Sequence, residues 1–265
     1  MKLKLTSAAL VALSILPLHI VAEEATVEEA VKEKPVFSGS AQLGILFKTG
    51  NTESNDLKSG FKLRYEKGDW LSLADFDILV KQADITDANG ETTSETTDQK
   101  WTVNSKTNYI LNHDDISYLY GNIWFEDDRF SGFENQSSVS VGWGKEWYKT
   151  DKSRFFADFG PGIKRDDYKP TDTKEGYTET DFIIQAQAYY LREINEHVEF
   201  KQTVSLKQAT ESDANSVYSA ETTITTKLIS TLQLQFAFKA DHNTEVEAGT
   251  ERTDTQTSVT LVYSF

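Results

Sequence analysis

The sequence contains no cysteine, which excludes disulfide bonds, thiolate metal sites and cysteine nucleophiles. Basic residues are also scarce, since 27 Lys and Arg stand against 42 Asp and Glu and give a formal net charge of −15. A nucleic-acid-binding surface has to neutralise phosphates with basic side chains. The acidic balance therefore argues against nucleic acid as a partner.

Long apolar runs are lacking beyond the first residues, and a membrane-spanning helix needs roughly 20 apolar residues. The chain opens with a basic start, Met1 to Lys4, followed by an apolar run that ends near Ala22. This pattern predicts a secretory signal peptide over residues 1–22. A single membrane anchor is the alternative, but polar residues interrupt the run. The acidic residues 23–36 are expected to form a short periplasmic leader.

From Phe37 onward the apolar residues recur with a period of two, which is the periodicity of β-strands. Turn residues separate the alternating segments. The pattern predicts twelve strands, at 37–49, 56–66, 71–82, 99–112, 116–126, 136–148, 154–165, 178–191, 197–207, 217–229, 231–240 and 253–265. We therefore expect an all-β, antiparallel domain over 37–265.

The last segment, 253–265, predicts how the apolar and polar faces are used. One face carries Val259, Leu261, Tyr263 and Phe265, and the other is polar apart from Val262. Apolar residues outside and polar residues inside are typical of a transmembrane β-barrel. A terminal Phe with an aromatic residue two positions earlier also resembles the signal recognised by the bacterial barrel-assembly machinery. That machinery is therefore an expected partner.

Short and long connections alternate along the chain, and in outer-membrane barrels the short turns are periplasmic. Both termini are thus expected in the periplasm. Aromatic residues predict two interfacial belts. The turn-end belt comprises Tyr65, Trp70, Tyr109, Tyr118, Trp147, Tyr148, Phe155, Tyr190, Phe200, Tyr263 and Phe265, and the loop-end belt comprises Phe47, Trp101, Trp124, Phe133, Tyr177 and Tyr218. A soluble β-sandwich or lipocalin-like barrel, with apolar residues inside, is the alternative.

The inner face is expected to be charged. The tight turn at Lys67–Trp70 places Lys62 opposite Asp75, so we predict an ion pair there. The predicted lumen-lining residues are Lys58, Lys62, Arg64, Asp75, Asp77, Lys106, Asp158, Asp181, Lys201, Glu221, Lys227 and Lys239, with Glu146 and Lys207 also inward. These charges predict either a narrow pore that selects its solute or a barrel plugged by its own ion pairs.

Two other kinds of chemistry are weaker. The acidic cluster Glu126-Asp127-Asp128 could hold a divalent cation that bridges to lipopolysaccharide, although a solvated outer surface explains it better. His242, near Ser212 or Ser216, is the one histidine placed for outer-leaflet catalysis, but no motif supports it. We therefore predict no catalytic, cofactor-binding or metal-binding residues.

A resemblance to a known family starts at the first predicted strand. Residues 39–44, Gly-Ser-Ala-Gln-Leu-Gly, and 48–54, Lys-Thr-Gly-Asn-Thr-Glu-Ser, resemble the opening of the YdiY-like salt-induced outer-membrane proteins (domain of unknown function 481). The resemblance covers 37–265 and implies an outer-membrane barrel without catalytic residues to carry over. Independently, Gly50-Asn51 suits a turn.

The sequence thus predicts a monomeric barrel in the bacterial outer membrane, in contact with its lipids and lipopolysaccharide. The expected function is a narrow passive channel for small solutes or ions, or a salt- or stress-related structural barrel. Two alternatives stay open: an outer-leaflet hydrolase of lipids or peptides, and a closed barrel whose acidic loops bind divalent cations or lipopolysaccharide.

Overall fold

The computed structural model describes residues 37–49, 54–86, 92–114, 116–129, 132–170, 175–212, 214–246 and 251–265. The predicted signal peptide, the leader and the Gly50-Asn51 turn lie outside these residues. No helix in the described part of the chain is long and apolar enough to cross a membrane.

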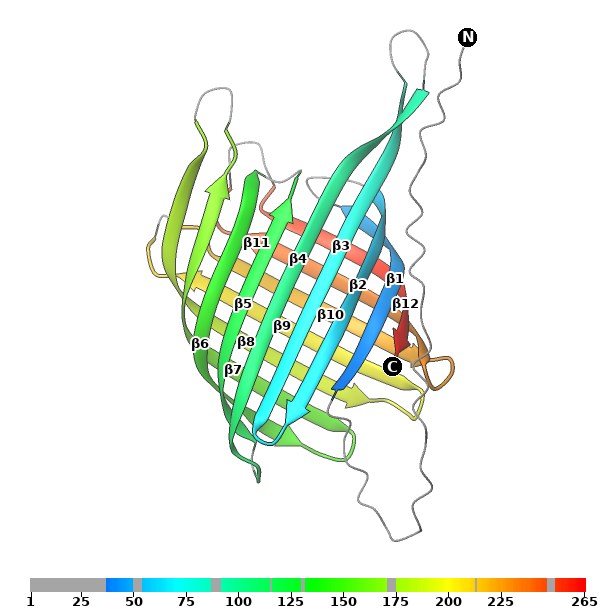
Figure 1. Ribbon diagram of the computed structural model, residues 1–265, viewed down its shortest axis with the longest axis vertical. Helices are drawn as coiled ribbons and strands as arrows, with labels where there is room; N and C mark the ends of the chain where they lie inside the picture. Colours follow the sequence, from blue (N-terminus) through cyan, green and yellow to red (C-terminus); the bar gives the residue numbers. More distant parts are fainter. Residues whose placement is uncertain are drawn as a thin grey trace. The chain divides into compact units, whose positions relative to one another are not determined.

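Twelve antiparallel strands close into a barrel in which each strand pairs with its sequence neighbours and the first pairs with the last (Figure 1). The prediction of twelve antiparallel strands is therefore confirmed. The strands are β1 (Phe37–Thr49), β2 (Ser54–Lys67), β3 (Trp70–Thr86), β4 (Thr92–Asn112), β5 (Ser117–Asp128), β6 (Phe133–Lys149), β7 (Ser153–Tyr168), β8 (Tyr177–Glu193), β9 (Val198–Ala209), β10 (Val217–Lys227), β11 (Leu232–Asn243) and β12 (Thr253–Ser264).

The barrel closes between β1 and β12. The N–H of Gly39 donates to the carbonyl of Phe265 at 3.0 Å, and the N–H of Phe265 donates to the carbonyl of Gly39 at 2.9 Å. These bonds place Phe37 and Phe265 at the barrel end that carries the tight turns. On β12, the predicted outward set Val259, Leu261, Tyr263 and Phe265 is exposed, and Val262 is buried, as expected from the alternation.

Exposure alternates along the strands in the sense expected for a barrel in lipid. Leu43 is 56% exposed beside Gln42 at 8%, and Val141 is 57% exposed beside Ser140 at 2%. An apolar exterior around a polar interior is the reverse of a soluble sandwich or lipocalin-like barrel. The soluble alternative is therefore excluded.

One predicted loop, 83–98, is wrong. Strand β3 continues to Thr86 and β4 begins at Thr92, and these ends pair with each other from Thr86↔Thr92 inward. Pairing with the outer neighbours ends earlier. Strand β2 pairs with β3 only as far as Val80, and β5 pairs with β4 only from Lys100. The two strands thus project beyond their neighbours as a ribbon (Figure 1). The segment is rich in β-branched Thr, which favours strands, but beyond the membrane nothing imposes an apolar–polar alternation.

Candidate functional site in the barrel interior

A pair of ion pairs lines the inner face of β2 and β3. Gly68 adopts a φ of 57° in the tight turn, a conformation that glycine reaches without steric cost. The turn sets the register Lys62↔Asp75, and Lys62 Nζ lies 3.8 Å from Asp75 Oδ1. Lys58 Nζ lies 3.8 Å from Asp77 Oδ1. The predicted Lys62–Asp75 ion pair is confirmed, and we name these four residues the β2–β3 ladder.

The β2–β3 ladder faces β9 and β10 across the interior. Glu221 on β10 is attracted most by Lys239, its cross-strand neighbour on β11, and then by Lys58 and Lys62 on β2, while Lys201 on β9 is repelled by Lys62. Neither Glu221 nor Lys201 forms a direct ion pair with any residue that the structure describes. Charges of both signs therefore face each other over this half of the interior.

The opposite half is filled by a buried cluster. Lys106 Nζ on β4 lies 2.5 Å from Asp158 Oδ2 on β7 and donates to Gln187 Oε1 on β8 at 3.0 Å. The hydroxyl of Tyr118 on β5 donates to the same Asp158 oxygen at 3.0 Å. The side chains of Lys106 and Asp158 are 5% and 0% exposed. Because β4 and β7 are not neighbours, this Lys106–Asp158 cluster reaches over the strands between them and packs that side of the lumen.

Further ion pairs line the loop end of the interior. Lys100 pairs with Glu126 at 2.6 Å and with Asp128 at 3.7 Å. Glu126 and Asp128 thus serve an internal lysine, while Asp127 occupies the opposite face of β5. The predicted acidic cation cluster is therefore divided between two faces. Among the described residues, no group of three or more His, Asp or Glu side chains could hold a metal ion.

Four aromatic residues predicted for the interfacial belts lie on the inward side instead: Tyr118, Trp124, and Phe133 and Tyr177, whose rings pack against the buried Tyr168. Tyr118 is 5% exposed and bonded to Asp158. Trp124 receives Lys207 Nζ at 3.4 Å from its ring centroid. Glycine makes room for the first, since a Cβ at Gly144 would lie 2.6 Å from the Tyr118 ring. The sequence carried a signal for this placement: Tyr118 and Trp124 alternate onto the same face of β5 as the polar Asn122, and that face points inward.

The other predicted lumen residues are dispersed. Asp181 lies 4.0 Å from Lys164, which also pairs with Asp166, and Lys239 pairs with Asp241 at 2.8 Å. The predicted inward Glu146 pairs with Arg154, while Arg64 pairs with Glu66 at 2.8 Å on its own strand. Sequence reasoning missed several inward residues that the same alternation would have supplied, namely Lys100, Tyr120, Lys164, Asp166, Gln187 and Asp241.

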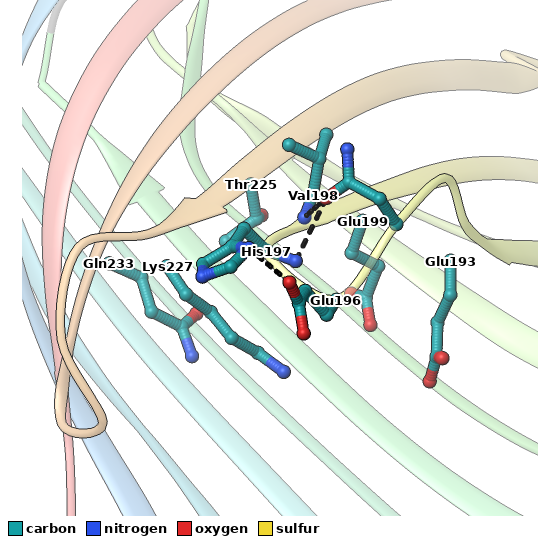
Figure 2. A pocket seen from close by; sticks show the side chains of 9 residues that line it. Glu193, Glu196, His197, Val198, Glu199, Thr225, Lys227 and Gln233 are labelled. Atoms are coloured by element: carbon teal, nitrogen blue, oxygen red, sulfur yellow. Dashed lines mark hydrogen bonds and ion pairs between the residues drawn. The ribbon is translucent and has the colours of Figure 1, made fainter.

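At the tight-turn end, a small cavity of about 130 Å³ opens beside the β8–β9 turn. Figure 2 shows Glu193, Glu199, Lys227 and Gln233 around it. The turn itself is held by Asn195, whose side-chain oxygen accepts the N–H groups of His197 and Val198. The predicted lumen residue Lys227 therefore lines this cavity at the tight-turn end of the barrel, among acidic side chains.

His242 and Ser216, the candidate catalytic pair, have separate partners. His242 Nδ1 lies 2.8 Å from Thr253 Oγ1, and its ring stacks on Tyr218. Ser216 Oγ accepts the N–H of Ala209 at 2.9 Å and is bonded to Gln208. Each side chain is thus engaged in holding a strand end.

Comparisons with solved structures identify the same fold. The NanC porin gives a TM-score of 0.51 at 11% identity, covering 84% of this chain and 98% of the porin. An outer membrane channel from Pseudomonas putida F1 gives 0.50 at 10% identity, covering 91% of this chain and 100% of the channel. The translocator domain of the autotransporter NalP from Neisseria meningitidis gives 0.52 at 9% identity, covering 89% and 90%. The expected localisation, the bacterial outer membrane, agrees with this fold.

Sequence comparisons identify the family. The uncharacterized protein YdiY of Escherichia coli (strain K12) is 26% identical over 238 residues, which cover 89% of this chain and 86% of YdiY. The family model described as "Protein of unknown function, DUF481" matches residues 41–265, nearly the whole barrel. The family resemblance inferred from the first strand is confirmed, and the chain belongs to the DUF481 family.

Proposed function

We propose that this barrel is a narrow, charge-lined passage for small ions or solutes across the outer membrane. The observation that carries the proposal is the exposure of the β2–β3 ladder. Its four side chains face inward, yet Lys58 and Asp77 remain 28% and 33% exposed and Lys62 and Asp75 remain 47% and 34% exposed. Inward side chains with this exposure border open space inside the barrel.

The two halves of the interior differ in how tightly they are filled. The Lys106–Asp158 cluster excludes solvent on the side of β4 to β8. The β2–β3 ladder, facing Lys201 and Glu221, borders the other side. Twelve strands lie between the small barrels filled by side chains and the wide porins. A passage confined to one half of the lumen is therefore the arrangement that these contacts support.

Orientation and assembly complete the proposal. The short turns, and with them the barrel end at Phe37 and Phe265, face the periplasm as in other outer-membrane barrels. The barrel acts as a monomer, and β12 with Phe265 is the segment that the assembly machinery recognises. We assign it no enzymatic activity.

Conductance in a planar lipid bilayer tests the passage. Wild-type protein is expected to give discrete steps. Lys62→Ala leaves the Asp75 carboxylate without its cation, because their atoms lie 3.8 Å apart. The freed carboxylate should attract a permeating cation by about 1 kcal/mol at this distance in water, and salt reduces this attraction. The cation-to-anion permeability ratio of Lys62→Ala is therefore expected to be about two- to fivefold higher than that of wild type. The reversal potential in a salt gradient measures it.

Arg165→Ala is the matched control, because Arg165 is 58% exposed and paired with Asp167 near the loop end of β7. Its selectivity should stay at the wild-type value. Folded protein that leaves the bilayer silent would contradict a passage and favour the closed barrel. Equal selectivity of Lys62→Ala and wild type would remove the β2–β3 ladder from the conducting path.

A further inference from the structure

A shallow groove lies on the outer surface at the turn end of β8 and β9. Tyr190, Arg192, Ile194 and Phe200 line it, and its volume is about 390 Å³. The Tyr190 and Phe200 rings meet edge to face, with centroids 6.3 Å apart, and Phe200 is the cross-strand partner of Arg192. The groove is thus an apolar surface with one cation at its edge.

Arg192 has an unusual setting for a charged residue. It is exposed and lies on the outward face of β8, in step with Phe182, Ile184 and Tyr190. Its backbone is paired with β7 and β9, but the guanidinium of Arg192 makes no hydrogen bond or ion pair with any residue that the structure describes. The acidic side chains of the same hairpin, Glu193, Glu196 and Glu199, instead line the cavity beside the β8–β9 turn (Figure 2). Because none of these carboxylates pairs with it, Arg192 is available to a ligand from the membrane.

We propose that this groove binds one glycerophospholipid through its phosphate. The guanidinium of Arg192 offers a planar set of donors that matches phosphate oxygens. Its long side chain can reach the headgroup level while its methylenes stay on apolar surface. The rings of Tyr190 and Phe200 suit the interfacial depth at which the glycerol backbone lies. Lipid binding here requires the barrel to lie in a membrane, but it does not require conduction.

Native mass spectrometry of the full-length protein in detergent micelles tests the site, with phosphatidylglycerol and a diacylglycerol of the same chains as probes. Wild type is expected to bind phosphatidylglycerol about tenfold more tightly than the diacylglycerol. This difference corresponds to one hydrogen-bonded charge interaction. Arg192→Gln should abolish this preference, and Arg192→Lys should keep part of it. Arg165→Gln should bind like wild type. Thermal unfolding of each variant verifies that it is folded.

Two outcomes would overturn the lipid assignment. If folded Arg192→Gln keeps the full preference for phosphatidylglycerol, the phosphate is bound elsewhere. If sn-glycerol 3-phosphate displaces the lipid at equal concentration, the groove is a site for soluble phosphate esters. Conductance of Arg192→Gln is expected to equal that of wild type, so failure at this site and failure of the passage can be told apart.

Discussion

Asp158→Ala is expected to destabilise the barrel by roughly 3–5 kcal/mol, the usual cost of removing one partner from a buried ion pair. The substitution leaves Lys106 with an uncompensated charge in a site where its side chain is 5% exposed. It also removes the acceptor of the Tyr118 hydroxyl. The free energy of unfolding in urea, followed by tryptophan fluorescence in lipid vesicles, measures the loss.

Asp75→Ala is the control for this experiment. Asp75 also pairs with a lysine inside the barrel, but its side chain is 34% exposed, so water can solvate the lysine that remains. The double variant Lys106→Met with Asp158→Leu removes both charges and should recover most of the stability. An Asp158→Ala barrel no less stable than Asp75→Ala would show that the cluster does not hold the wall together.

The second large effect is expected from Gly160→Ala on β7. A Cβ at this position would lie 2.0 Å from the carbonyl oxygen of Val141 and 2.5 Å from the Cα of Gly142. Both are backbone atoms, so β6 and β7 have to separate to accommodate the methyl group. The ladder is already weak here, because Pro161 has no N–H to donate. We expect a cost of about 3 kcal/mol and a lower fraction of folded barrel after refolding into vesicles.

Gly121→Ala provides the matched comparison. It adds the same methyl group to the neighbouring part of the barrel wall, on β5, but nothing lies within 4 Å of the new Cβ. It should refold as wild type. If Gly160→Ala refolds equally well, the close approach of β6 and β7 is not needed for barrel closure.

The sequence predicted which side chains face inward better than which of them meet. Strict alternation identifies a residue's face, and the turn at Gly68 fixes the register of its own hairpin, so Lys62–Asp75 could be predicted. The contact of Lys106 with Asp158 spans the interior between strands that are not paired. It depends on the cross-section of the barrel, which neither periodicity nor turn chemistry determines.

Strand β5 shows a second limit. Aromatic residues stand on both of its faces, with Tyr118 and Trp124 inside and Phe125 outside against Trp101. Counting aromatic residues along this strand therefore predicted belt positions for Tyr118 and Trp124, although both rings belong to the lumen. The polar neighbours on the same face, such as Asn122, carry the distinction, because a lipid-facing row would not contain a buried amide.

The projecting ribbon of β3 and β4 allows the position of the barrel rim to be located along the chain. Beyond Val80 each strand has a bonded neighbour on one side only, whereas Trp101 to Asn108 are held on both sides. An isolated two-stranded hairpin is only marginally stable in water. Amide protons of the ribbon should therefore exchange with deuterium well before those of the same strands inside the barrel. The residue of β4 at which the exchange rate drops would mark the rim of the barrel, where the strand passes from solvent into the continuous wall.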